Sequence, residues 1–164
     1  MSAPLKTNAV VINSIPYGDS DLIVTFMTGE HGVIKGMAKG ARKSRKRFAG
    51  CFEPFNEITL GARLKETGGL AAVDTADVVD AHPGIRDSLD KIGSGMAMLE
   101  LTAAFEAPGP GSAKELRLLK EGLRLLEASD GPRELCAAFF VKYLAVAGYK
   151  IPFGRCAGCN AGLG

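Results

Sequence analysis

Apolar and polar residues alternate in short segments through the first 80 residues of the chain. In 22–27, Leu22, Val24 and Phe26 fall on one face of an extended strand and the residues between them on the other. Segments of this kind, separated by turn signals such as 29–32 (GEHG), occur at 7–13, 22–27, 33–39, 55–60 and 70–79. Because five short strands without a helical period favour a small barrel over a sandwich, the pattern predicts a five-stranded barrel of the OB-fold type.

The hydrophobic period changes near residues 81–84 (AHPG), where Pro83 suits the first turn of a helix. We therefore expect two domains, an OB-fold domain over 1–80 and a small helical domain over 81–164. The first expected helix carries one apolar stripe, made of Ile85, Leu89, Ile92, Met96, Leu99 and Ala103.

Two more helices are expected in the second half. One begins at Ser112, which can form a capping box with Glu115, and it turns its leucines at 116, 119, 123 and 126 inward. The other runs from Leu135 to about Ala147 and ends at Gly148, a residue typical of helix C-termini. The predicted fold class is thus α+β, a barrel followed by a three-helix bundle.

Composition narrows the class of protein. The chain has 164 residues, 46% of them hydrophobic and 23% charged, which excludes collagen, coiled coil and general disorder. Its four cysteines are too few and too unevenly spread for a secreted disulfide scaffold, so a reducing, cytoplasmic setting is expected. The sequence also predicts neither a signal peptide nor a membrane span, and hence no membrane partner.

Positive charge is concentrated in one basic segment, which runs from Lys35 to Arg47. Subtracting its seven cations from the net charge of +2 leaves the other residues at −5, and the segment contains no acidic residue. The asymmetry predicts a polyanionic partner, with nucleic-acid backbone ahead of a merely solvated face. The expected contacts are Lys35, Lys39, Arg42, Lys43, Arg45, Lys46 and Arg47.

Three phenylalanines follow the basic segment and have two interpretations. They could stack on unpaired bases, or they could belong to the barrel core. We expect Phe52 and Phe55 to be core residues, and the pattern leaves both alternatives open for Phe48.

Cys156 and Cys159 have the spacing of half a zinc site, in which a Cys-x-x-Cys knuckle gives two thiolates to a tetrahedral metal. No completing pair is evident, since His31 falls in a turn, His82 at a helix start and Cys136 on a helix. A partial zinc site and two metal-free surface cysteines remain alternatives. A thioredoxin-type redox role is disfavoured because the pair does not open a helix within a βαβ unit.

Catalytic chemistry is not expected from this sequence. The chain has only two histidines, and its glycine-rich stretches match neither a phosphate-binding loop nor a dinucleotide fingerprint. Asp19 and Asp21 flank Ser20 in a predicted turn, where such side chains usually bond their own backbone. We therefore predict a binding protein rather than an enzyme.

Several short motifs are spread over essentially the whole chain, at 17–21 (YGDSD), 26–32 (FMTGEHG), 38–42 (AKGAR), 54–55 (PF), Leu144 with 148–149 (GY), and the pair Cys156 and Cys159. In their order and spacing these motifs resemble the bacterial recombination mediator family RecO. The resemblance implies an OB-fold domain followed by a helical domain with a zinc-finger-like insertion. It also implies a non-enzymatic, cytoplasmic and nucleoid-associated role in gap and double-strand-break repair.

In that role the protein would bind single- and double-stranded DNA and anneal complementary strands. It would act with RecR and single-strand DNA-binding protein to load RecA. Chains of this family generally continue with a second cysteine pair, so this chain resembles a C-terminally truncated form, and zinc binding is in doubt. Of the family's DNA-contacting surface, only the seven basic positions named above carry over.

Two other functions compete with DNA annealing. The chain could be a protein-docking adaptor whose basic loop binds acidic tails, or an RNA-binding OB module. Binding to an acidic peptide but not to DNA would favour the first, and a preference for RNA over DNA strands of equal length would favour the second.

Overall fold

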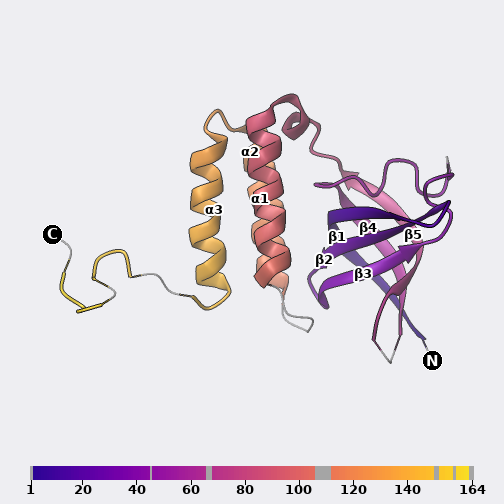
Figure 1. The fold of residues 1–164 in the computed structure, drawn as a ribbon, viewed down its shortest axis with the longest axis horizontal. Helices are drawn as coiled ribbons and strands as arrows, with labels where there is room; N and C mark the ends of the chain where they lie inside the picture. Colours follow the sequence, from indigo (N-terminus) through magenta and orange to yellow (C-terminus); the bar gives the residue numbers. More distant parts are fainter. Residues whose placement is uncertain are drawn as a thin grey trace.

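The computed structural model describes residues 2–44, 46–65, 68–105, 112–149, 152–156 and 158–162. Five strands are followed by a short 3₁₀ helix and three α-helices (Figure 1). The strands are β1 (Ser2–Tyr17), β2 (Asp21–Thr28), β3 (Gly32–Ala38), β4 (Glu57–Lys65) and β5 (Ala71–Asp80). The helices are η1 (Pro83–Asp87), α1 (Leu89–Phe105), α2 (Ala113–Ala128) and α3 (Pro132–Val146).

The strands close into a barrel in the order β1-β2-β3-β5-β4, which confirms the predicted barrel and fold class. Strand β1 is long enough to pair with β4 through its first half and with β2 through its second. A register shift between Val11 and Asn13 accompanies this exchange, as expected where a strand bends around a barrel. A short parallel pairing of β3 with β5 at Gly36 and Met37 completes the closure.

Close packing inside the barrel requires glycine at position 36. A Cβ there would lie 2.7 Å from Val73 Cγ2 and 3.2 Å from the ring of Phe26, so one of them would have to move. From the sequence, Gly36 is only a small residue on a predicted strand. The close approach of β3 to β5 explains why a larger residue does not fit there.

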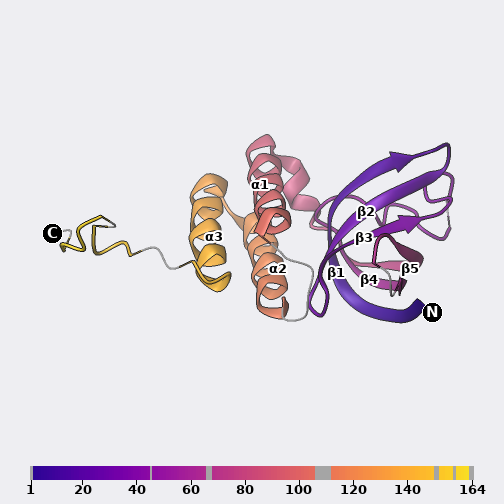
Figure 2. The same ribbon diagram turned by 60° about the horizontal axis from the view of Figure 1, so that its bottom comes forward.

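Helices α1, α2 and α3 stand beside the barrel, with α3 farthest from it (Figures 1 and 2). An apolar cluster joins the barrel to the helices. Val10, Met27 and Phe55 from the barrel side pack in it against buried side chains of the helices. The predicted inward leucines of α2, at 116, 119, 123 and 126, are all buried, which confirms that face.

The predicted stripe on α1 is partly wrong. Leu99 is buried, but Leu89 is 86% exposed, and Met96 and Ala103 are exposed as well. The buried face is instead rotated toward Ser94, Gly95, Met98, Leu99 and Thr102. Small residues allow this close approach, since a Cβ at Gly95 would lie 2.8 Å from the ring of Phe55. A pattern of apolar residues alone could not find a face built partly on glycine, serine and threonine.

The helix ends match the predictions unequally. Ser112 occupies the N-cap position of α2 but makes no side-chain capping hydrogen bond, so the predicted capping box is wrong. Gly148 ends α3 with φ of 97°, and the Tyr149 N–H donates to the Leu144 carbonyl at 2.7 Å. This six-residue closure around a left-handed glycine confirms the predicted helix end.

The C-terminal segment extends away from the helices (Figure 1). Within the described ranges, no helix has both the length and the apolar character needed to cross a membrane. The strands end at Asp80 and η1 begins at Pro83, so the change of structure falls at the predicted boundary, while independent folding of 1–80 and 81–164 stays a prediction.

Candidate nucleic-acid interface

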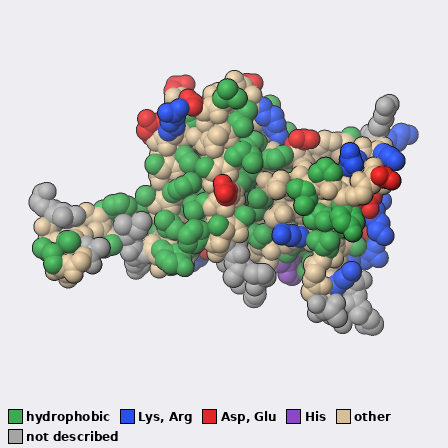
Figure 3. Space-filling view, viewed as in Figure 1, with side chains coloured by type: hydrophobic (Ala, Val, Ile, Leu, Met, Phe, Trp, Pro, Cys, Tyr) green, Lys and Arg blue, Asp and Glu red, His purple; other side chains and the backbone are tan. Residues whose placement is uncertain are grey.

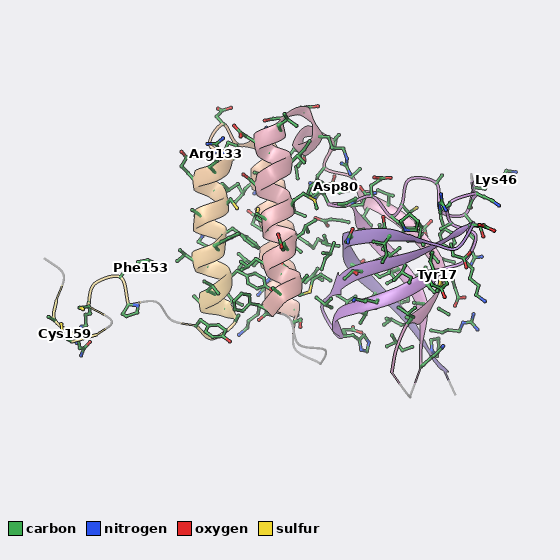
Figure 4. All side chains as sticks on the ribbon, in the orientation of Figure 1. Tyr17, Lys46, Asp80, Arg133, Phe153 and Cys159 are labelled. Atoms are coloured by element: carbon green, nitrogen blue, oxygen red, sulfur yellow. The ribbon has the colours of Figure 1, made fainter. Side chains whose placement is uncertain are left out.

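The basic segment lies on β3 and on the connection that follows it. Lys35 is exposed on β3, and Lys39, Arg42, Lys43, Lys46 and Arg47 are exposed in the connection, whereas Arg45 lies outside the described residues. Lys46 lies at the end of the barrel that faces away from the helices (Figure 4). Lysine and arginine side chains gather over this end of the molecule (Figure 3).

Hydrogen bonds to the β1–β2 turn hold the start of this connection. The Gly40 N–H donates to Asp21 Oδ1 at 2.8 Å, and the Arg42 N–H donates to the Ser20 carbonyl at 3.0 Å. The Arg42 guanidinium adds a bond to the Gly18 carbonyl at 3.2 Å. The Gly40 N–H, with smaller contributions from Ser20 and the charge of Lys39, lowers the pKa of Asp21. The Asp21 carboxylate therefore links the β1–β2 turn to the connection after β3. The sequence predicted only hydrogen bonds within a local turn here, and not this link.

The far end of the connection is held by Arg47 and Phe48. The Arg47 guanidinium donates to the Asp74 carbonyl on β5 at 2.7 and 2.9 Å and stacks 4.6 Å above the ring centre of Phe48. Ser44 Oγ accepts hydrogen bonds from the backbone N–H groups of both residues, at 3.0 and 3.3 Å. We call the segment 39–47, anchored in this way at both ends, the basic loop.

Phe48 belongs to the barrel core. Its side chain is 3% exposed, and its ring centre lies 5.1 Å from that of Phe52. Phe52 and Phe55 are buried too, as expected. Base stacking by Phe48 is therefore wrong for this structure, because its ring fills the space beneath the basic loop.

Within the described ranges, the cations of the basic loop have no close carboxylate partner. In the part of the chain that the structure describes, no cation of the basic loop lies within 4.0 Å of a carboxylate oxygen, and Lys35 does not either. Asp74, the nearby candidate, bonds Arg63 through both oxygens at 2.8 Å, and this contact lowers the pKa of Asp74. The ammonium groups of Lys39, Lys43 and Lys46 thus remain available to a polyanion.

A buried histidine joins the barrel to the helices, and sequence reasoning missed it. His82 is 1% exposed, with Nε2 3.1 Å from Glu57 Oε1 and Nδ1 3.2 Å from Glu127 Oε2. Lys120 pairs with the other oxygen of Glu57 at 2.8 Å. Ligand atoms of Asp80, His82 and Glu127 lie within 4.8 Å of one another, but both histidine nitrogens already face hydrogen-bonding partners. The cluster is therefore a structural junction between β4, η1 and α2.

Cys156 and Cys159 lie in a turn that backbone hydrogen bonds close. The Asn160 N–H donates to the Cys156 carbonyl at 2.9 Å, and the Cys156 N–H donates to the Ala161 carbonyl at 2.8 Å. Hydrogen bonds from the backbone of Cys159 and Gly158, and from the Cys159 side chain, lower the pKa of Cys156.

The donor set fits half of a zinc site. Two thiolates on such a turn suit one half of a tetrahedral centre, which needs four ligands. Cys51 is buried among the apolar side chains of the barrel, and Cys136 on α3 donates to the Ser94 carbonyl of α1, so neither completes the site. The described residues thus supply two of four ligands.

The lowered pKa of Cys156 predicts a reactive thiolate. Alkylation of Cys156 by iodoacetamide should follow a pH profile with a midpoint below the ordinary thiol value of 9.0, because the turn's hydrogen bonds favour the charged form. Peptide mass spectrometry across a pH series measures it. In denaturant the midpoint should rise to that of an ordinary thiol. An unchanged midpoint on denaturation would contradict the role of the turn.

Comparison with known proteins identifies the family. The model "Recombination protein O N terminal" matches residues 1–82, and "Recombination protein O C terminal" matches 86–164. A protein named DNA repair protein RecO from Anaeromyxobacter sp. (strain Fw109-5) is 34% identical over 100% of this chain and 64% of its own length. Proteins of that name from Geobacter metallireducens and Syntrophus aciditrophicus are each 35% identical over 96% of this chain, and over 64% and 61% of theirs. The chain spans a little less than two thirds of these curated relatives, and it belongs to the recombination protein O family.

Proposed function

We propose that this chain binds DNA through its basic loop and serves DNA repair and recombination by promoting the annealing of complementary strands. The observation that carries the proposal is the basic loop itself, anchored at both ends, with exposed lysines that no described carboxylate pairs. Family membership supports the choice of DNA as the polyanion, since the curated relatives carry the name DNA repair protein RecO.

The annealing mechanism follows from electrostatics. Two DNA strands repel each other through their phosphates, and cations held between them lower this repulsion. Phosphate contacts position a strand without reading its sequence, so base pairing between the strands supplies the specificity. A loop fixed to β2 and β5 presents its charges without first being ordered, which reduces the entropic cost of binding.

The partners extend this proposal. We expect RecR and single-strand DNA-binding protein to act with this chain, so that RecA is loaded onto DNA at the bacterial nucleoid. A zinc ion on Cys156 and Cys159 would brace the C-terminal turn once two further ligands are supplied. The role is one of binding, and no step in it requires a catalytic group of this chain.

Annealing of two complementary labelled oligonucleotides, followed by energy transfer, tests the proposal. The wild-type chain should accelerate annealing, and replacing Lys39, Lys43 and Lys46 by alanine should remove most of the acceleration. The matched control replaces Lys114, Arg117 and Lys142, three exposed cations of α2 and α3, and should retain it. Equal activity of the loop variant and the wild type would overturn the proposal.

The same samples separate the competing functions. Tighter binding to an RNA strand than to a DNA strand of equal length would favour an RNA-binding module instead. Salt-sensitive binding to an acidic peptide, without binding to DNA, would favour a protein-docking adaptor.

A further inference from the structure

We propose that Tyr17 stacks on an unpaired base of a single strand whose phosphates contact the basic loop. This inference rests on the proposed DNA binding and deepens it, because it assigns single-stranded nucleic acid as the preferred ligand of this end of the barrel. It names a residue outside the basic segment.

Tyr17 is an exposed aromatic residue that the fold does not use. Its side chain is 54% exposed, and among the described residues it makes no ring contact and no hydrogen bond. The other two tyrosines differ, since Tyr143 is buried and Tyr149 packs edge-on against Phe105 with ring centres 5.5 Å apart. Removal of the Tyr17 ring should therefore leave the fold intact.

A hydrogen bond joins the basic loop to the chain segment that carries Tyr17. Tyr17 ends β1, and the next residue, Gly18, accepts the hydrogen bond from the Arg42 guanidinium at 3.2 Å. Tyr17 and Lys46 both lie at the end of the barrel away from the helices (Figure 4). A phosphate bound by the loop would therefore bring its nucleotide close to the ring.

Strand pairing holds the backbone of Tyr17 in place. Tyr17 pairs across the hairpin with Asp21, whose carboxylate accepts the Gly40 N–H of the basic loop. Ile15, two residues earlier on the same face of β1, is 50% exposed and extends the apolar surface. Because the backbone that carries the ring is already held at a strand end, base stacking has to order the side chain only.

Stacking distinguishes single strands from duplexes. An aromatic side chain can stack on any unpaired base, whereas the bases of a duplex are already stacked on their neighbours. The basic loop should bind both forms through phosphates, and Tyr17 should add affinity only for the single strand. We expect its removal to weaken binding to an oligo(dT) strand about tenfold and to change duplex binding less than twofold.

Fluorescence anisotropy with an oligo(dT) strand, an abasic strand of the same length and a duplex tests the inference. Tyr17→Ala should bind oligo(dT) more weakly than the wild type does, with no loss of affinity for the abasic strand or the duplex. Tyr17→Phe should retain the affinity for oligo(dT), and the control Tyr149→Ala should match the wild type. Because the chain has no tryptophan, Tyr17→Trp supplies a single reporter. Its fluorescence should be quenched by oligo(dT) and not by the abasic strand. Unchanged oligo(dT) affinity in Tyr17→Ala, or equal quenching by both strands, would overturn the inference.

The two proposals fail in different ways. If replacing Lys39, Lys43 and Lys46 leaves binding to all three ligands unchanged, the proposed DNA binding by the loop is wrong. If that replacement weakens all three and Tyr17→Ala weakens none, only the stacking role of Tyr17 is wrong.

Discussion

Replacing Lys39, Lys43 and Lys46 together by alanine should weaken the binding of single- or double-stranded DNA about 30-fold at moderate salt. All three side chains are exposed and, within the described structure, make no ion pair or hydrogen bond, so their loss removes charge without removing a contact that holds the loop. About 0.7 kcal/mol per exposed charge pair gives roughly 2 kcal/mol for three, which corresponds to that factor.

Anisotropy titrations measure this loss, and the control isolates the effect of position from that of net charge. The variant with Lys114, Arg117 and Lys142 replaced carries the same change in charge on the helical side and should bind within about threefold of the wild type. An equal loss in both variants would mean that binding depends on overall charge, and the basic loop would have no special part in it.

His82→Ala should lower the free energy of unfolding by about 2–3 kcal/mol. The imidazole lies between Glu57 and Glu127, and without it two largely buried carboxylates lose a partner. This is less than the roughly 3–5 kcal/mol typical of a broken buried pair, because Lys120 still pairs with Glu57 and Glu127 is 29% exposed. Urea unfolding followed by circular dichroism measures the change.

His31 offers the matched control for the junction. It is partly exposed in the β2–β3 turn, and its Nε2 lies 4.0 Å from Glu30 Oε2. His31→Ala should change the free energy of unfolding by less than about 0.5 kcal/mol. If the two histidine variants were equally stable, the junction would contribute nothing to the attachment of the helices to the barrel.

Local patterns predicted the barrel well and the helix packing less well. The alternation in 22–27 gave a strand that the structure extends by one residue at each end, to Asp21–Thr28. The inward leucines of α2 were found because that helix buries apolar side chains. The face of α1 was found only at Leu99, because Gly95 and Thr102 also pack there and close approach rather than hydrophobicity selects them.

The charges of the candidate site could be predicted from sequence, but their support could not. A run of cations without acids is visible in the sequence itself. Asp21 and Gly40 are 19 residues apart, and the antiparallel pairing of β2 with β3 brings them together. The same holds for His82, which lies 25 residues from Glu57 and 45 from Glu127. Phe48 was undecided for a related reason, since only the folded connection shows that its ring points inward.

The most direct test of the central claim is the salt dependence of binding to a single-stranded oligonucleotide. With five to seven phosphate contacts by the basic segment, the logarithm of the association constant should fall against the logarithm of salt concentration with a slope of about −3.5 to −5. In the variant lacking Lys39, Lys43 and Lys46 the slope should be shallower by about 2. A flat dependence in the wild type, or the same slope in both proteins, would contradict the account.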